Sequence, residues 1–159
     1  MNNRLNAAQM KKLKSRFRAA GCAVKDLNDS TFEVIDDDFP VRTHVEANPY
    51  YVQLGTYVLA KPPRAVAKTK VRDLLCDINL KAKLVKFTME ADGPDKETAA
   101  WPILASVKFV TGVAGGDYHA SAIKNLFLLW LQDIAELMAN APTSFEIHPM
   151  MDIEKLKDA

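Results

Sequence analysis

The three histidines and two cysteines are the residues of this sequence that can take part in the widest range of catalytic and metal-binding chemistry. His44, His119 and His148 stand far apart, without the i, i+4 pairing or the cysteine companions that mark zinc sites. Cys22 comes directly after a predicted helix, and Cys76 falls inside another, where a small buried thiol is favoured over a nucleophile. Folding could still bring a cysteine and a histidine together, but we expect no catalytic residue, no metal site and no cofactor.

Two further segments have the composition of ion-binding loops. The aspartates at 36–38 offer oxygen ligands for Ca²⁺ or Mg²⁺, but Phe39 and Pro40 interrupt the spaced donors that a metal loop needs. The glycine-rich segment 112–116 lies between a predicted strand and a predicted helix, where phosphate-binding loops occur. It lacks the Gly-Lys-Ser/Thr ending of such loops. We interpret the first segment as a turn and the second as a change of chain direction.

Basic side chains are concentrated in residues 1–25, which carry seven of them and no acidic one, although the whole chain has a formal net charge of only +1. On the predicted helix 5–20, Lys11, Lys14 and Arg18 lie opposite the apolar face, where they could bind phosphate or another anion. No aromatic side chains interleave with them, and no nucleic-acid reading motif adjoins them. A solvated helix face explains them equally well, so nucleic-acid or phosphate binding is the alternative hypothesis.

The last predicted helix, residues 118–139, is apolar almost all the way round. A stripe at helical spacing should face the core: Ile123, Phe127, Trp130, Ile134 and Leu137. Leu128 and Leu129 lie outside this stripe, although burying a large apolar side chain is worth roughly 1.5–3 kcal/mol. We expect a second copy or a partner protein to cover them. Cover from within the chain, by the first helix or by residues beyond 141, remains the other interpretation.

The remaining pattern predicts a helix over 5–20 and strands over 31–35, 41–46 and 50–60, followed by a helix that begins between 64 and 69 and ends near 80. Strands over 84–91 and 103–111 precede the last helix. The short turns favour antiparallel pairing. The sequence therefore predicts a two-layer α+β fold with a five-stranded antiparallel sheet, helices on one face, and the order α-β-β-β-α-β-β-α. Residues 1–142 form one domain in this prediction, and 143–159 form a C-terminal tail.

The sheet face away from the helices has the composition of an interface. Alternation on the third strand points Tyr51, Gln53 and Tyr57 to that face, near Arg42 and His44 of the preceding strand. Tyrosine and arginine are enriched at protein interfaces. Tyrosine is also favoured on ordinary solvent-facing sheets, so both interpretations stand.

The run Leu74-Leu75-Cys76-Asp77-Ile78-Asn79-Leu80, continuing through 81–84 into the strand Val85-Lys86-Phe87-Thr88-Met89-Glu90, resembles the YbjN-type family of candidate bacterial sensory-transduction regulators. That family is similar in fold to the type III secretion chaperones, and in both a long C-terminal helix follows the second strand pair. The resemblance covers roughly residues 5–140. It implies a non-enzymatic protein-binding or regulatory domain, often dimeric, and it offers no catalytic residues.

We therefore expect a cytoplasmic bacterial protein that binds a protein partner, as a chaperone-like or regulatory module and as a homodimer, and that is not an enzyme. The chain shows no apolar run of about 18 residues and begins with a charged helix, so we expect no membrane segment. The sequence argues against nucleic acid as the main partner. The expected protein-binding residues lie on the sheet face and the last helix: Arg42, His44, Tyr51, Tyr57, Leu128 and Leu129.

Overall fold

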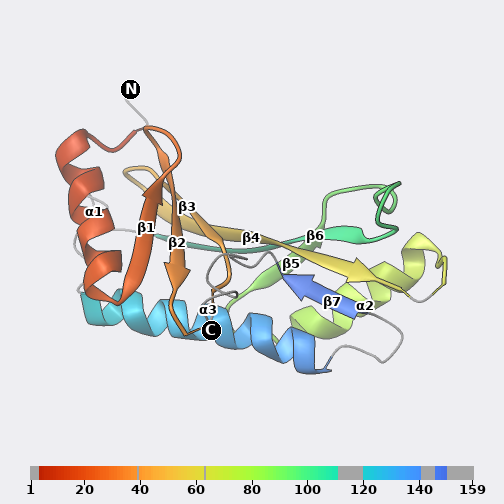
Figure 1. The fold of residues 1–159 in the computed structure, drawn as a ribbon. Helices are drawn as coiled ribbons and strands as arrows, with labels where there is room; N and C mark the ends of the chain where they lie inside the picture. The colour runs from red at the N-terminus through yellow and green to blue at the C-terminus, as the bar shows by residue number, and fades with distance from the viewer. Residues whose placement is uncertain (1–3, 39, 63, 111–119, 141–145, 150–159) are drawn as a thin grey trace. The chain divides into compact units, whose positions relative to one another are not determined.

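The computed structural model describes residues 4–38, 40–62, 64–110, 120–140 and 146–149. These residues divide into two compact units: the first holds the described residues up to Gly55 and of 107–128, and the second holds those of 56–106 and 129–149. Strands β4 (Tyr51–Lys61) and β6 (Trp101–Val110) and helix α3 (Ala120–Asn140) contribute to both units (Figure 1). Each unit is described below by itself.

Helix α1 (Ala7–Ala19) opens the first unit, and its two ends are defined by local chemistry. The Asn6 side chain accepts a hydrogen bond from the Gln9 backbone N–H at 2.8 Å, and the Gln9 side chain accepts one from the Asn6 N–H at 3.0 Å. This reciprocal capping satisfies two donors that a helix start leaves open. Gly21 follows the C-cap with φ +95°, a left-handed conformation that ends the helix.

Four antiparallel strands follow α1 where the sequence predicts three. They are β1 (Cys22–Asp26), β2 (Thr31–Asp36), β3 (Thr43–Ala47) and β4. In the turn between β1 and β2, the Asn28 side chain accepts a hydrogen bond from the Ser30 N–H at 2.9 Å. The register sets Glu33 of β2 opposite His44 of β3, and His44 opposite Gly55 of β4.

The core of the first unit contains an aromatic contact between helices and sheet. Phe17 of α1 meets Phe32 of β2 edge-on, with ring centroids 5.6 Å apart, and meets Phe127 of α3 at 6.4 Å. All three rings are buried. Edge-to-face packing of this kind adds to the energy of burial. Both helices therefore pack on the Phe32 face of this unit's sheet.

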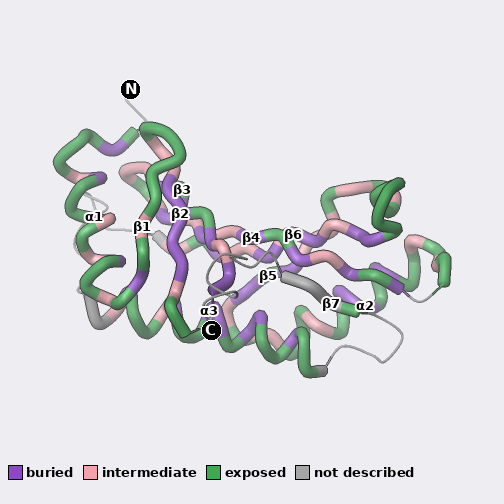
Figure 2. The backbone as a smooth tube through the Cα atoms, viewed as in Figure 1, coloured by how far each residue is buried: buried purple, intermediate pink, exposed green. Residues whose placement is uncertain are grey.

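In the second unit, helix α2 (Lys68–Lys81) packs against strand β5 (Lys86–Met89), which pairs antiparallel with β6 so that Phe87 lies opposite Ala105. Strand β7 (Glu146–Pro149) pairs antiparallel with β4, with His148 opposite Leu59. Buried positions alternate with more exposed ones along β4, the pattern of a strand with one face on the core (Figure 2).

The prediction of a five-stranded sheet is wrong. The strand order is β1-β2-β3-β4-β6-β5, six strands on the main path, and β7 pairs with β4 off this path. The element order is accordingly α-β-β-β-β-α-β-β-α-β. Strand β1 was missed because it is an edge strand whose Ala23, Lys25 and Asp26 are exposed, which removes the apolar alternation. Strand β7 lies in the segment predicted to be a tail.

The antiparallel α+β architecture and all three predicted helices are confirmed. Figure 1 shows α3 as the long helix of the chain, and its predicted core stripe is buried at every position. None of the helices in the described part of the chain combines the length and the apolar character needed to cross a bilayer.

Candidate binding surfaces

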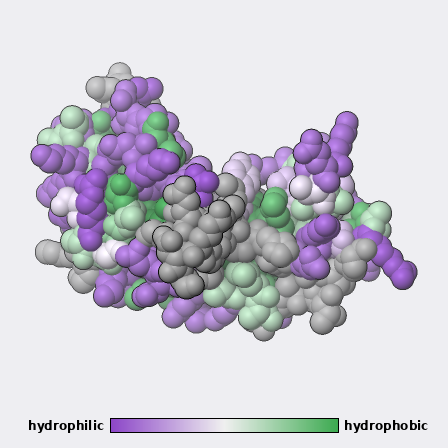
Figure 3. Space-filling view, in the orientation of Figure 1, coloured by the Kyte–Doolittle hydropathy of each residue, from purple (hydrophilic) through white to green (hydrophobic). Residues whose placement is uncertain are grey.

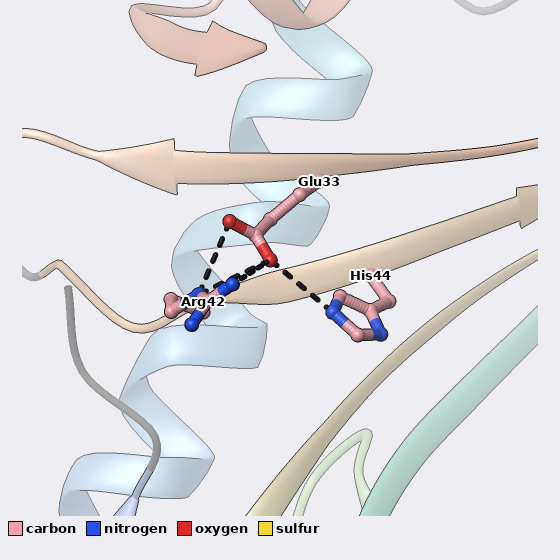
Figure 4. A network of polar contacts seen from close by, with 3 residues as sticks. All are labelled: Glu33, Arg42 and His44. Carbon is pink, nitrogen blue, oxygen red and sulfur yellow. Dashed lines mark hydrogen bonds and ion pairs between the residues drawn. The ribbon is translucent and has the colours of Figure 1, made fainter. Parts of the chain in front are cut away.

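A buried carboxylate lies at the centre of the polar contacts in the first unit. The Glu33 side chain is 2% exposed, and Arg42 and His44 both point at it (Figure 4). The Arg42 Nε donates to both carboxylate oxygens, at 3.1 and 3.2 Å, and its Nη2 lies 3.0 Å from Oε2. The His44 Nε2 lies 3.2 Å from the same Oε2. Glu33 is therefore held by a forked guanidinium contact and one imidazole contact.

Strand alternation explains why these three side chains meet. Phe32 and Val34 of β2 are fully buried, and Glu33 between them points to the opposite face of the strand. The register places His44 directly across from Glu33, and Arg42 lies two residues before His44, on the same side. Glu33 was not among the predicted site residues. Its place between the apolar Phe32 and Val34 puts it on the outer face of the strand, and only the pairing with β3 shows that Arg42 and His44 lie beside it.

The cluster presents two polar groups to solvent and shields its carboxylate. Arg42 and His44 are partly exposed, whereas the Glu33 carboxylate is not. Because ion pairs with buried carboxylates hold a guanidinium in one geometry, Arg42 and His44 are ordered before any partner arrives.

The two tyrosines predicted for this face have separate neighbours. Tyr51 in the first unit lies under the ammonium of Lys108, with Nζ 4.2 Å from the ring centroid, a cation–π contact. Tyr57 in the second unit donates its hydroxyl hydrogen bond to Glu90 Oε2 at 2.8 Å. That hydrogen bond, together with partial burial and the Glu90 charge, raises the pKa of Tyr57 above its ordinary value. The structure thus joins Arg42 with His44, but it assigns Tyr57 to the other unit.

On α3, Leu128 is 46% exposed and Leu129 is 37% exposed. Met138, which the prediction did not name, is exposed to a similar degree on the same helix. Within the part of the chain that the structure describes, these three large apolar side chains remain open to solvent. Exposed apolar side chains that gather on one element mark association sites more often than isolated ones do.

The basic residues of α1 lie together but are not all available to an anion. Lys11, Lys14 and Arg18 line one shallow depression of about 680 Å³. Asp26 and Asp29 line it as well, and the Lys14 ammonium lies 2.6 Å from the Asp26 carboxylate. Residues over α1 are largely hydrophilic (Figure 3). The predicted anion-binding residues are therefore neighbours, with part of their charge already neutralised.

The other candidates for chemistry are dispersed. The prediction that Cys76 is buried is wrong, because its side chain is exposed on α2, while Cys22 at the start of β1 is buried. The buried face of α2 is formed by Val71, Leu74 and Leu75, and position 76 falls outside it. Among the residues that the structure describes, no three metal-binding side chains gather. His119 and the glycine-rich segment 112–116 lie outside the described residues.

The sequence matches no protein-family model, and it matches no curated protein. The structure is similar to the crystal structure of YbjN from E. coli, which is described as a candidate transcription regulator. The TM-score is 0.59, the alignment covers 80% of this chain and 87% of YbjN, and 8% of the aligned residues are identical. The chain therefore has a YbjN-like fold, which confirms the fold that the sequence resemblance implies.

Proposed function

We propose that this protein is a non-enzymatic protein-binding module, chaperone-like or regulatory, that acts as a homodimer through the outer face of α3. The observation that carries the proposal is the exposure of Leu128 and Leu129 on a helix whose core stripe is fully buried. Leaving such side chains in water forgoes about 1 kcal/mol or more for each, a large share of a domain's net stability. Burying the two leucines in an interface would recover this free energy.

The position of the leucines favours a second copy of the chain as the occupant. Residues 128 and 129 lie close to the middle of α3, which runs from Ala120 to Asn140. Where two identical helices cross on a two-fold axis, residues at the crossing point contact their own counterparts. A crossing near residue 129 therefore buries both leucines of each copy against apolar surface.

The sheet surface of Glu33, Arg42 and His44 is the part we assign to a different partner protein. Arginine is enriched among residues that dominate interface energies, and an ordered side chain loses less entropy on binding. The YbjN-like fold supports a regulatory role, since YbjN is described as a candidate regulator. The buried carboxylates Glu33 and Asp133 are both engaged by neighbouring donors, which fits binding rather than proton transfer.

Light scattering after size-exclusion chromatography tests the dimer. The wild-type chain at micromolar concentration is expected to have twice the monomer mass, and the double variant Leu128→Glu, Leu129→Glu the monomer mass with unchanged circular dichroism. Leu80→Glu is the matched control, because Leu80 is 85% exposed on α2 and outside the proposed interface. A monomeric wild type, or an equal effect of the control, contradicts the proposal.

The second candidate function is nucleic-acid or phosphate binding through α1. The observation in its favour is that Lys11, Lys14 and Arg18 line the same depression. It predicts retention on immobilised nucleic acid that weakens as salt increases. Replacing the three residues by alanine should abolish the retention, whereas Lys25→Ala, an exposed lysine on β1, should not. Retention that survives the triple change removes this candidate.

A further inference from the structure

A small cavity in the second unit combines apolar walls with a negatively charged rim. It lies where the C-terminal end of α2 meets α3, and its volume is about 110 Å³. Leu74 and Ile78 of α2 and Leu137 of α3 supply the apolar lining. Asp77 and Glu136 supply carboxylates from the two helices. None of these residues belongs to the surfaces described above.

The cavity is held in shape by Asp133, which also lines it. Its carboxylate is 2% exposed and accepts three backbone hydrogen bonds from the segment that follows α2. Oδ1 accepts from the Lys83 N–H at 3.0 Å, and Oδ2 accepts from Leu84 at 2.6 Å and Val85 at 2.8 Å. These bonds fix α3 to the segment between α2 and β5. The cavity is therefore largely preformed.

The electrostatic environment favours a cation. Three carboxylates line the cavity, together with the end of α2, where the last carbonyl groups carry the negative end of the helix dipole. The opposing charges are Lys81 on the rim and Lys83, whose Nζ lies 3.8 Å from Glu136 with both side chains about half exposed. Contacts between such exposed charges are weak. With the buried Asp133 counted, three carboxylates stand against two lysines, a balance of −1 around the cavity.

We propose that this cavity binds the side chain of a lysine from a partner protein. An apolar cavity of about 150 Å³ accommodates benzene, so 110 Å³ accommodates a chain of about four methylenes. The lysine stem packs against Leu74, Ile78 and Leu137, and its ammonium lies at the rim beside Asp77. A lysine side chain combines this length with a compact positive charge. The inference rests on the proposed protein-binding function and specifies one group that the partner supplies.

Methyl NMR with n-butylammonium, the side chain of lysine as a free ion, tests the site directly. Titration should shift the methyl signals of Leu74, Ile78 and Leu137, and n-butanol and butyrate should bind several-fold more weakly. Added salt should weaken the ammonium alone. Asp77→Asn should reduce its affinity about threefold, as expected for one partly exposed charge pair. Asp73→Asn is the matched control, because Asp73 is exposed on the same helix and does not line the cavity.

A short capped peptide containing lysine, compared with its norleucine counterpart, then distinguishes a protein side chain from a free amine. Binding of the lysine peptide with the same methyl shifts supports the proposal, and binding of butylammonium without the peptide overturns it. Equal binding of butanol identifies a plain apolar cavity and also overturns it. Light scattering of Asp77→Asn should still show a dimer, so failure here is distinguishable from failure of the proposed dimer.

Discussion

At the scale of single residues, Glu33 gives Arg42 and His44 a fixed orientation. Arginine loses substantial side-chain entropy when a partner immobilises it, and an existing ion pair removes part of that cost before binding. The carboxylate itself is out of reach of a partner, because only 2% of the side chain is exposed. Glu33 therefore orients Arg42 and His44 and does not itself face solvent.

Glu33→Gln should destabilise the fold. Hydrogen bonds to charged groups are worth about 1.5–3 kcal/mol. Since Arg42 and His44 are partly exposed and can turn to water, we expect a loss of about 1–2 kcal/mol in the free energy of unfolding. Urea denaturation measures it. Glu46→Gln, an exposed carboxylate on the neighbouring strand, should change stability little, and an equal loss there would rule out a specific role for Glu33.

We expect Tyr57 to lose its phenolic proton at a higher pH than an ordinary tyrosine does. Its raised pKa means that the folded protein holds the phenolic proton more tightly than the unfolded chain does. The resulting stability is complete below the ordinary tyrosine pKa of about 10 and is lost as the pH rises through the higher pKa of the folded state. Tyrosinate absorbance during an alkaline titration measures it. Glu90→Gln should move the Tyr57 midpoint down, and an unchanged titration curve would contradict this account.

Residue types and strand alternation were enough to group Arg42 with His44, which the structure brings together on Glu33. They were not enough to find Glu33, because a carboxylate on a strand reads as solvent-facing until the facing strand is known. Cys76 shows the same limit on a helix. Its neighbours Leu74 and Leu75 are buried, but the phase of α2 against the sheet decides which side position 76 takes.

At the scale of elements, the junction between α2 and β5 depends on one side chain from α3. Asp133 accepts hydrogen bonds from three backbone N–H groups in the segment between α2 and β5. Buried backbone donors without an acceptor are costly, so this one carboxylate allows the chain to leave a helix and enter a strand within four residues. The contact spans about fifty residues of sequence, so neither segment alone reveals it.

Asp133→Asn should therefore destabilise the second unit by about 2 kcal/mol, because the amide nitrogen cannot accept a backbone N–H. Amide hydrogen exchange at Leu84 and Val85 should accelerate in the variant, which a general loss of stability would not confine to these two positions. Asp73→Asn provides the matched control. Unchanged protection at both amides would show that Asp133 does not hold the junction.

Periodicity predicted α3 well, because five positions at helical spacing meet one core and all five are buried. It failed for β1, whose side chains Lys25 and Asp26 reflect an edge of the sheet rather than its interior. Strand β7 is four residues long, and only its pairing with β4 identifies it as a strand. The sequence therefore predicts elements that bury one face in the core. Strands at the edge of a sheet are identified only from the strands they pair with.

At the scale of the whole molecule, the proposed binding surfaces belong to different elements. The exposed leucines belong to α3, Arg42 and His44 to the start of β3, and the cavity proposed to bind lysine to the meeting of α2 with α3. In a dimer formed through α3, each copy would contribute one sheet surface. Two copies of that surface would then bind partners with increased avidity where both can engage.

Dimer formation should couple stability to concentration. Because the dimer interface stabilises only the folded chain, the melting temperature should rise as the wild-type concentration increases. The Leu128→Glu, Leu129→Glu variant should melt at one temperature across the same range. Differential scanning fluorimetry over a hundredfold dilution series measures both. A wild-type melting temperature that does not change with concentration would mean that folding proceeds without association.

Asn79 protects part of the edge of the sheet from pairing with other copies of the chain. Its side-chain amide donates to the Phe87 carbonyl at 2.9 Å and accepts the Phe87 N–H at 2.8 Å. It therefore occupies both backbone groups of Phe87 in β5, the last strand of the sheet path. An unprotected border of this kind is a template for fibrillar growth, since a strand from another molecule can attach to it. At Phe87 the amide takes the place of that strand, so this part of the β5 edge is closed to such pairing.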